Sequence, residues 1–239
     1  MRVFAISDLH LPGGDTKPME VFGAHWDDHM RRIASDWSAR VAPEDLVLLP
    51  GDLSWAMKLS DALPDLALVD SLPGQKLILR GNHDYWWGAI GTLREVLSPN
   101  MRALQNDAVD AGDVVIAGSR GWLTPGTEPL GAEDDKIYRR EQIRLRLSLD
   151  HARRLAGGDR PIIGMTHFPP VGDGGRASGF TELFESYGVE LAVYGHLHGP
   201  GIKSGFWGEA RGVNYRLVSC DALGFQLMQV WPPENRVIV

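Results

Sequence analysis

The stretch KLILRGNHD (residues 76–84) decides how the rest of this sequence is interpreted. Its run of leucine and isoleucine predicts a buried strand, and Gly81 allows the backbone to turn sharply where that strand ends. Asn82, His83 and Asp84 then follow as three consecutive polar side chains. Polar residues presented at the tip of a strand indicate a functional site rather than a hydrophobic core.

Four further apolar runs end in polar residues in the same way. The runs cover residues 3–7, 46–50, 162–166 and 191–194, and the polar residues that follow them are Asp8, His10, Asp52, His167, His196 and His198. In open α/β sheets, ligands bind beyond the carboxyl ends of the strands. We therefore expect the five strand ends to converge on one crevice.

The composition limits the class of protein. With 239 residues, of which 44% are hydrophobic, the chain can bury the core of one α/β domain over residues 1–239. A formal net charge of −7 argues against general binding to nucleic acid or to anionic membranes. The single cysteine, Cys220, excludes an intrachain disulfide and favours a reducing compartment.

The start of the chain and its apolar runs bear on location. Met1 and Arg2 lead directly into the first predicted strand, so we expect no signal peptide. No apolar run approaches the length of a membrane span. These features predict a cytoplasmic protein, and they leave the oligomeric state open.

Helical and strand patterns alternate along the chain. Apolar spacings of three and four predict helices, which we expect near residues 18–39, 63–71, 90–97, 134–156 and 183–184. Between residues 101 and 121 the pattern changes to short strands joined by turns, which favours antiparallel pairing. The chain is expected to finish in strands at 213–219, 225–231 and 237–239. The order predicts an α/β fold in which two sheets pack face to face with helices outside.

The polar residues at the strand ends are of the kinds that bind metal ions. Besides the amide of Asn82, they are Asp8, His10, Asp52, His167, His196 and His198. Seven ligands are too many for one tetrahedral ion, and a set without thiolates disfavours a structural zinc site. Two ions that share a bridging carboxylate would use all seven. Mixed imidazole and carboxylate ligation suits Mn²⁺, Fe, Zn²⁺, Co²⁺ or Ni²⁺.

The order of these motifs resembles that of the calcineurin-like metallophosphoesterases. The family pattern is D-x-H, G-D, G-N-H-D/E, a lone histidine after a strand, and G-H-x-H. All five blocks occur here in that order, as Asp8-Leu9-His10, Gly51-Asp52, Gly81-Asn82-His83-Asp84, His167 and Gly195-His196-Leu197-His198. The resemblance implies a four-layer αββα sandwich of two mixed β-sheets flanked by helices.

The resemblance also implies a role for each matching residue. The ligands implied for one ion are Asp8, His10 and His198, and those implied for the other are Asn82, His167 and His196. Asp52 would bridge the two ions, of which we expect Mn²⁺ foremost. His83 would not be a ligand but would donate a hydrogen bond or a proton to the departing oxygen. Two such cations lower the pKa of a shared water, so the resemblance implies attack of a metal-bridged hydroxide on a phosphoester.

One departure from the family follows the second motif. In the protein phosphatase branch this motif continues with an acid and an arginine, which orient the histidine and clamp phosphate. Here it continues as LSWA (residues 53–56), which argues against protein-phosphatase activity and leaves the partner of His83 unidentified. Arg120, after a predicted strand, is the candidate for the clamp, ahead of Arg139 or Arg140. The alternative role for Arg120 is a surface salt bridge.

Several aromatic and acidic residues beside the motifs leave two interpretations open. Trp55, Trp86 and Trp87 each follow a ligand motif, and Trp122 follows a strand end. They could line the cleft and stack on a base, or they could pack in the core against the sheet edges. Asp84 could orient a ligand or cap the following helix.

These observations predict a metal-dependent phosphohydrolase in which Asp52 and His83 are catalytic and Asn82 and Arg120 contact the substrate. The expected substrate is a phosphodiester or a small phosphorylated metabolite. A nucleotide pyrophosphohydrolase is the alternative enzyme, and only the tryptophans support it. A non-catalytic scaffold on the same fold is the alternative from a different class, and the complete ligand set argues against it.

Overall fold

Two β-sheets form the centre of the protein. The computed structural model describes residues 1–14, 19–126 and 130–233. Within these residues, the first sheet has the strand order β11 (Met228–Trp231), β1 (Val3–Ala5), β2 (Leu46–Leu49), β3 (Gln75–Ile78), β4 (Met101–Ala103). The second has the order β5 (Ala108–Asp110), β6 (Val115–Ser119), β7 (Ile162–Thr166), β8 (Val189–Tyr194), β10 (Val213–Leu217), β9 (Gly208–Ala210). Both sheets are mixed, because the strands β11, β5 and β9 pair in antiparallel fashion with parallel inner strands.

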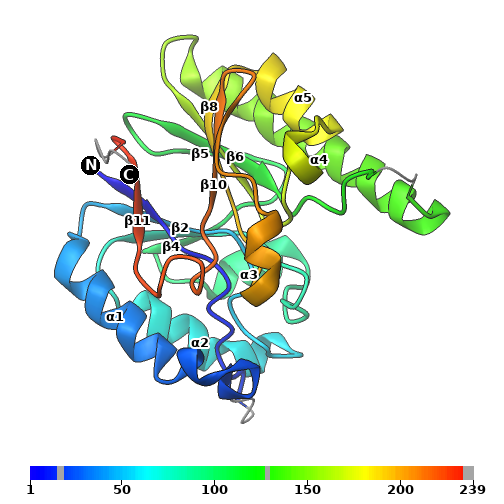
Figure 1. The fold of residues 1–239 in the computed structure, drawn as a ribbon. Coiled ribbons are helices and arrows are strands. Elements are labelled where there is room, and N and C mark those ends of the chain that lie inside the picture. Colours follow the sequence, from blue (N-terminus) through cyan, green and yellow to red (C-terminus); the bar gives the residue numbers. More distant parts are fainter. Residues whose placement is uncertain (15–18, 127–129, 234–239) are drawn as a thin grey trace.

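Helices cover the outer face of each sheet (Figure 1). The first sheet is covered by α1 (His29–Arg40), α2 (Leu59–Asp70) and α3 (Ile90–Val96), and the second by α4 (Ala132–Ala156) and α5 (Gly179–Ser186). Short 3₁₀ helices complete the set: η1 (Met19–Phe22), η2 (Ala24–Trp26), η3 (Asp173–Gly175) and η4 (Gly199–Ser204). A cluster of buried side chains fills the space between the two sheets. The predicted αββα sandwich is therefore confirmed.

Alternating side chains along the strands build these layers. In β1, Val3 and Ala5 belong to the cluster between the sheets, whereas Phe4 belongs to the cluster beneath α1 and α2. In β6, Ile116 faces the first sheet and Ala117 faces α4. Successive side chains of a strand point to opposite faces, so apolar runs without alternation suit sheets that are covered on both sides.

Parallel pairing brings the strand ends to one edge. β1 and β2 run side by side with Ala5 opposite Leu48, and β3 follows β2 in the same direction. Beyond the end of β1, Ser7 pairs with Ser219 of the second sheet in a parallel bridge. The two sheets are therefore joined at the edge from which the predicted site residues project.

The predicted helix over residues 18–39 is wrong in its first half, where η1 and η2 take its place. Gly23 has a φ of 130° and Asp28 a φ of 51°. These positive values interrupt a right-handed helix. The regularly spaced apolar residues that predicted this helix do not form one buried face, because Phe22 is 61% exposed whereas Trp26 is buried. Residue 18 lies outside the described residues.

The other elements follow the predictions with local differences. α3, α4 and α5 lie where they were expected, and α2 begins earlier than predicted, at Leu59. Antiparallel pairing holds for β5 and β6, but β4 pairs with β3 in parallel because α3 crosses over between them. The predicted strand over 225–231 begins at Met228 as β11, and the one over 237–239 lies outside the described residues.

Of the helices that the structure describes, none is both long and apolar enough to cross a membrane. α4 is the longest at 25 residues, and it carries charged residues along its length. The cytoplasmic location and the single domain over residues 1–239 stay predictions.

Candidate metal centre

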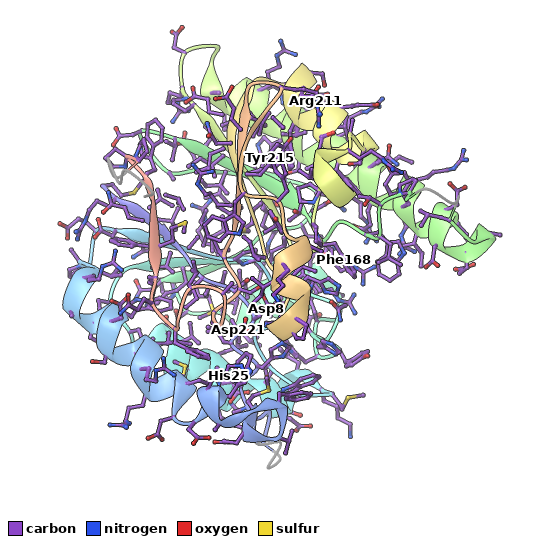
Figure 2. All side chains as sticks on the ribbon, viewed as in Figure 1. Asp8, His25, Phe168, Arg211, Tyr215 and Asp221 are labelled. Atoms are coloured by element: carbon purple, nitrogen blue, oxygen red, sulfur yellow. The ribbon has the colours of Figure 1, made fainter. Side chains whose placement is uncertain are left out.

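Side chains from both sheets meet at the edge where the strands end. Asp8 and Asp221 are labelled near the middle of the molecule in Figure 2. His198 Nε2 lies 3.1 Å from Asp8 Oδ1 and 3.3 Å from His10 Nε2. Because the ligand atoms of Asp8, His10 and His198 all lie within 4.8 Å of one another, these residues could hold one metal ion.

A second group lies next to the first and shares Asp8 with it. The ligand atoms of Asp8, Asp52 and His167 also lie within 4.8 Å of one another. Asn82 extends this group, because its Oδ1 lies 2.7 Å from His167 Nε2 and 2.8 Å from His196 Nδ1. Asn82 and His196 are thus in place to complete the set of the second group.

Asp52 lies between the two groups. Its Oδ2 is 3.9 Å from His10 Nε2 and 3.4 Å from His167 Nε2. The structure therefore brings together all seven side chains that the sequence singled out, from the ends of β1, β2, β3, β7 and β8. Their individual roles as ligands stay predictions.

The backbone is strained at four of these residues. Asp8, His10, Asp52 and His196 have φ values of 61°, 46°, 52° and 75°. Such a conformation costs a non-glycine residue on the order of 1–3 kcal/mol and persists only where the surroundings hold it. Here the Asp8 amide donates to the Gly51 carbonyl and the His10 amide to the Asp52 carbonyl, both at 3.0 Å. Concentrated strain of this kind is typical of functional sites.

Two glycines of the motifs are required by the close approach of carboxylates. A Cβ atom at Gly81 would overlap with Asp52 Oδ1, and one at Gly195 would overlap with Asp8 Oδ2. Any larger residue at either position would displace a carboxylate from the centre. The glycines of the G-N-H-D and G-H-L-H blocks therefore have a packing role, and neither has a positive φ.

Asp84 holds the loop of Asp52 in place. Its buried carboxylate accepts hydrogen bonds from the amides of Gly81 (2.7 Å), Asp52 (2.9 Å), Leu53 (2.9 Å) and Ser54 (3.2 Å) and from Trp86 Nε1 (3.0 Å). α3 begins only at residue 90, so Asp84 does not cap it. Burial, together with the nearby Asp52 carboxylate, raises the pKa of Asp84 to about 6. Of the two alternatives, the structure supports orientation of a ligand.

Hydrogen bonds at the far nitrogen of two histidines set which nitrogen faces the centre. His167 Nδ1 donates to the Pro50 carbonyl at 2.9 Å, which leaves Nε2 toward Asp52. His198 Nδ1 lies 2.8 Å from Asp221 Oδ1, which leaves Nε2 toward Asp8. Such outer partners orient metal-binding imidazoles.

Asp221 was not among the site residues predicted from the sequence. It follows the apolar strand at 213–219 by two residues, the same pattern that identified Asp8 after the first strand. This position after a predicted strand could have identified Asp221 from the sequence. Its other carboxylate oxygen accepts the Gly199 amide at 2.9 Å, so Asp221 also anchors the chain after His198.

The electrostatics of the two groups favour one positive charge in each. Burial alone would lower the pKa of His198, but Asp8 and Asp221 raise it to about 10. Burial would likewise lower the pKa of His167, but Asp52 raises it to about 9. Each group of the protein alone thus holds an imidazolium beside a carboxylate. A donor set that attracts a proton in this way fits a divalent cation.

The remaining two histidines are suited to be neutral ligands. Burial lowers the pKa of His10 to about 4, and burial together with His167 lowers that of His196 to about 4. At neutral pH both imidazoles therefore keep a lone pair to offer. Neutral imidazole is a common metal ligand in proteins.

Aromatic rings surround His83. The His83 amide donates to Asp52 Oδ1 at 2.8 Å, which ties its backbone to the centre. Its ring centroid lies 4.5 Å from that of Trp55, 5.7 Å from that of His10 and 6.4 Å from that of Tyr85. Trp55 also stacks on His10, with a centroid distance of 4.6 Å and an interplanar angle of 22°. Trp55 therefore packs against the rings of both His83 and His10.

The other tryptophans lie in different environments. Trp86 and Trp87 are each 2% exposed and belong to the core of the first sheet, so the core-packing alternative holds for them. Trp122 is half-buried, packs 4.9 Å from Phe168 and donates from Nε1 to Asp134 at 3.0 Å. Phe168, labelled in Figure 2, packs in turn 4.2 Å from the His196 ring.

Arg120 lies beside the centre. Its carbonyl accepts the amides of both His167 and Phe168 at 3.0 Å. Its guanidinium lies 4.6 Å over the Trp122 ring and 3.9 Å from Glu141. Because Glu141 is fully buried, this is not the surface salt bridge considered as the alternative. Arg139, by contrast, is exposed on α4 and donates to Asp135.

Comparison with known proteins identifies the family. The sequence profile described as calcineurin-like phosphoesterase matches residues 1–200, a range that includes every motif block. The chain belongs to the calcineurin-like phosphoesterase family. The predicted resemblance is thus confirmed. A curated relative, the Gene 66 protein of Mycobacterium phage D29, is 26% identical over 203 residues, which cover 85% of this chain and 81% of that protein.

Solved structures share the fold of this calcineurin-like phosphoesterase. The phosphopantetheinyl hydrolase PptH of Mycobacterium tuberculosis has a TM-score of 0.56 at 15% identity and covers 98% of this chain and 97% of its own. The protein of unknown function AQ665 of Aquifex aeolicus has a TM-score of 0.53 at 14% identity, with 95% of each chain covered. TT1561 of Thermus thermophilus has a TM-score of 0.50 at 18% identity and covers 95% of this chain and 97% of its own.

Membership of the family and the geometry agree. The protein is a hydrolase that acts on phosphoester bonds, and the family implies a small phosphorylated substrate. The Asp and His groups at the strand ends support dependence on metal ions. These conclusions leave the substrate, the identity of the metal and the number of ions to be proposed.

Proposed function

We propose that this calcineurin-like phosphoesterase holds two divalent ions and hydrolyses a phosphodiester or a small phosphorylated metabolite. The observation that carries the proposal is the pair of adjacent ligand groups that share Asp8. Asp52, between the groups, has one oxygen within 4 Å of an imidazole nitrogen of each. A shared carboxylate between two sets of imidazoles is the donor set that a pair of cations requires.

The residues proposed for each set are those that the family resemblance implies. One ion would be held by Asp8, His10 and His198, and the other by Asn82, His167 and His196, with Asp52 bridging. When bound, the ions would supply activation of a water and neutralisation of phosphoryl oxygens. We propose Mn²⁺ as the native metal, with Fe, Zn²⁺, Co²⁺ or Ni²⁺ as alternatives that the same ligands accept.

The chain's own residues complete the reaction. His83 would donate a hydrogen bond or a proton to the departing oxygen, and its packing against Trp55 would keep the imidazole in that position. Asp84 would keep Asp52 in place, because its carboxylate accepts the backbone amides of Asp52, after β2, and of Gly81, after β3. Asn82 and Arg120 would contact anionic oxygens of the substrate.

The alternatives have less support. Trp86 and Trp87 are in the core, so two of the residues that favoured a nucleotide pyrophosphohydrolase do not line the cleft. A scaffold without activity has no need for seven ligand-type side chains that converge, four of them at strained positions. We propose action in the cytoplasm, without general binding to nucleic acid.

Metal analysis joined to a substrate screen tests the proposal. We would measure the metal content of the purified protein and then assay phosphodiesters, phosphomonoesters and nucleotides in Mn²⁺. We expect two ions per chain and turnover of bis(p-nitrophenyl) phosphate. One ion per chain in a fully loaded sample would refute the dinuclear centre, and inactivity toward every substrate with every divalent ion would support the scaffold.

A further inference from the structure

A cavity lined by arginines opens beside the metal centre. Its volume is about 290 Å³, and its walls come from the ends of β3, β4 and β6 and from one side of α4. The charged residues that line it are Arg80, Arg120, Arg140, Glu141 and Arg144. We call these five residues and the space between them the arginine pocket.

The arginine pocket has more positive charge than its own carboxylate can neutralise. Glu141 faces Arg144 at 2.8 Å, Arg140 at 3.7 Å and Arg120 at 3.9 Å, and all three contacts are with the same oxygen, Oε1. The Glu141 side chain is 1% exposed, so its charge faces these three arginines rather than solvent. One buried carboxylate among four guanidinium groups leaves a net positive site.

Polar atoms in the pocket lack partners. Among the described residues, the Nε atoms of Arg80 and Arg120 and Oε2 of Glu141 are buried without a hydrogen bond. A buried donor without an acceptor is costly, and native proteins keep such groups where a ligand or a water satisfies them. Two unpaired N–H donors in a positive cavity are suited to an anion.

The charges in the pocket also act on one another. Burial lowers the pKa of the Arg120 guanidinium, Glu141 counteracts this, and the nearby Arg80, Arg140 and Arg144 lower the pKa further. Arginines that repel one another in this way gain from an added negative charge. Guanidinium groups also match phosphate and carboxylate oxygens in their fork geometry.

The pocket is attached directly to the metal centre. Arg80 precedes Asn82 by two residues, a span of at most about 7 Å along the backbone. The Arg120 carbonyl holds the amides of His167 and Phe168. The backbone segments that position Asn82 and His167 therefore also position two arginines of the pocket.

We propose that the arginine pocket binds a second anionic group of the substrate, a phosphate or a carboxylate remote from the phosphoester that is cleaved. The inference rests on the proposed function and narrows it to substrates with two separate anionic groups. The volume, at the lower end of ligand pockets, suits one compact group rather than a whole nucleotide. A free anion that occupies the same arginines is the other source of this chemistry.

Binding of inorganic phosphate tests the pocket without any need for turnover. The full-length, metal-loaded protein is titrated in a calorimeter, and we compare Arg140→Gln with Arg139→Gln. Arg140 lines the pocket and leaves Glu141 paired with Arg144 when it is replaced, whereas Arg139 pairs with Asp135 outside it. We expect wild type and Arg139→Gln to bind a phosphate in addition to the one at the metals, and Arg140→Gln to bind that phosphate about tenfold more weakly.

A second variant should act in the opposite direction. Glu141→Gln removes the only carboxylate of the pocket, so it should tighten the binding of the additional phosphate several-fold. A variant that had merely lost its fold would bind phosphate less well instead. If wild type binds no additional phosphate and none of the three variants differs from it, the arginine pocket is only a structural ion network and the inference is wrong.

Paired dinucleotides decide between a substrate group and a free anion. ApA and pApA share one phosphodiester and differ by a terminal phosphate, so their affinities for the metal-loaded protein can be compared by the same titration, with His83→Asn added to the wild-type and variant chains alike so that cleavage during the titration is minimal. We expect wild type and Arg139→Gln to prefer pApA about tenfold and Arg140→Gln to lose that preference. Equal affinities in wild type, together with binding of the additional inorganic phosphate, would assign the pocket to a free anion and overturn the substrate assignment.

Failure of the arginine pocket and failure of the proposed function give different results. A protein that binds the additional phosphate and prefers pApA but hydrolyses no substrate would support anion binding by the arginine pocket and refute the proposed hydrolase activity. A protein that hydrolyses bis(p-nitrophenyl) phosphate with two ions per chain, but in which Arg140→Gln does not change phosphate binding, would support the proposed hydrolase activity and refute the role of the arginine pocket.

Discussion

The metal centre and the arginine pocket lie at the same edge of the sandwich, and they differ in how their charged groups are held, although His10 Nδ1 at the metal centre is also buried without a partner among the described residues. At the metal centre, amides tie the carboxylates down: the His83 amide donates to Asp52, and the His196 amide donates to Asp8. In the arginine pocket, buried Nε atoms of Arg80 and Arg120 have no partner among the described residues.

The difference shows what each site is prepared to bind. A cluster of carboxylates and imidazoles, held by outer hydrogen bonds, presents lone pairs to a cation without further rearrangement. A cluster of guanidinium groups with unpaired N–H donors presents positive charge to an anion. One edge of the fold thus offers places for metal ions and, next to them, a place for an anionic group.

The largest effect is expected at Asp52, whose carboxylate lies within 4 Å of an imidazole of each ligand group. Asp52→Asn removes the negative charge between them, so hydrolysis of bis(p-nitrophenyl) phosphate should fall about 10³-fold and the metal content should drop. Steady-state kinetics and elemental analysis measure the two effects. Asp135→Asn, on the surface of α4, is the matched control and should behave as wild type. Full activity with a normal metal content in Asp52→Asn would refute the proposed bridging role of Asp52.

His83 separates the reaction from metal binding. His83→Asn removes a proton donor but no proposed ligand, so kcat should fall about 10²- to 10⁴-fold while the metal content stays normal. Metal analysis of the same sample is the control. A loss of metal in His83→Asn would show that His83 belongs to the metal centre itself, contrary to its proposed role.

Asp221 tests whether outer hydrogen bonds prepare the centre. Asp221→Asn weakens the partner of His198 Nδ1, so the affinity for the metal should fall about 10- to 100-fold, while the fold remains. Titration with Mn²⁺ measures the affinity, and circular dichroism checks the fold. Asp150→Asn, whose carboxylate accepts the Tyr187 hydroxyl, is the control. An unchanged metal affinity would mean that His198 needs no such support.

The smallest effect is expected for a conservative change in the arginine pocket. Arg140→Lys keeps the charge but loses the planar fork, so binding of the additional phosphate should weaken about threefold, less than in Arg140→Gln. Calorimetry with inorganic phosphate measures it. If Arg140→Lys binds as poorly as Arg140→Gln, geometry rather than charge dominates the pocket.

The contrast between the two sites also explains what sequence reasoning could find. The metal centre is built from strand ends, and a short apolar run followed by Gly81-Asn82 is a local pattern that survives in the sequence. The arginine pocket joins Arg80 after β3, Arg120 after β6 and three residues of α4. Arg120 and Arg140 were predicted as separate candidates for the phosphate clamp, because no local sequence pattern shows that they share a cavity.

Other errors come from local backbone turns and from distant contacts. The helix predicted over residues 18–39 followed a regular apolar spacing, but Gly23 and Asp28 adopt positive φ and interrupt it. Trp86 and Trp87 follow a ligand motif, yet the backbone turn after Asp84 directs both into the core of the first sheet. Asp221 becomes the partner of His198 only because β10 lies next to β8.

The sequence by itself determined the strand ends, the identity of the seven ligand-type side chains and the family, because each depends on residues that are adjacent along the chain. Only the tertiary structure decided which of these side chains meet, that Asp52 faces imidazoles of both groups, that Asp221 supports His198, and that three arginines contact Glu141 while a fourth lines the same pocket. The physical reason is that strand pairing and helix packing bring together residues far apart in the chain, and the charges and unpaired donors that define a site arise only from that meeting.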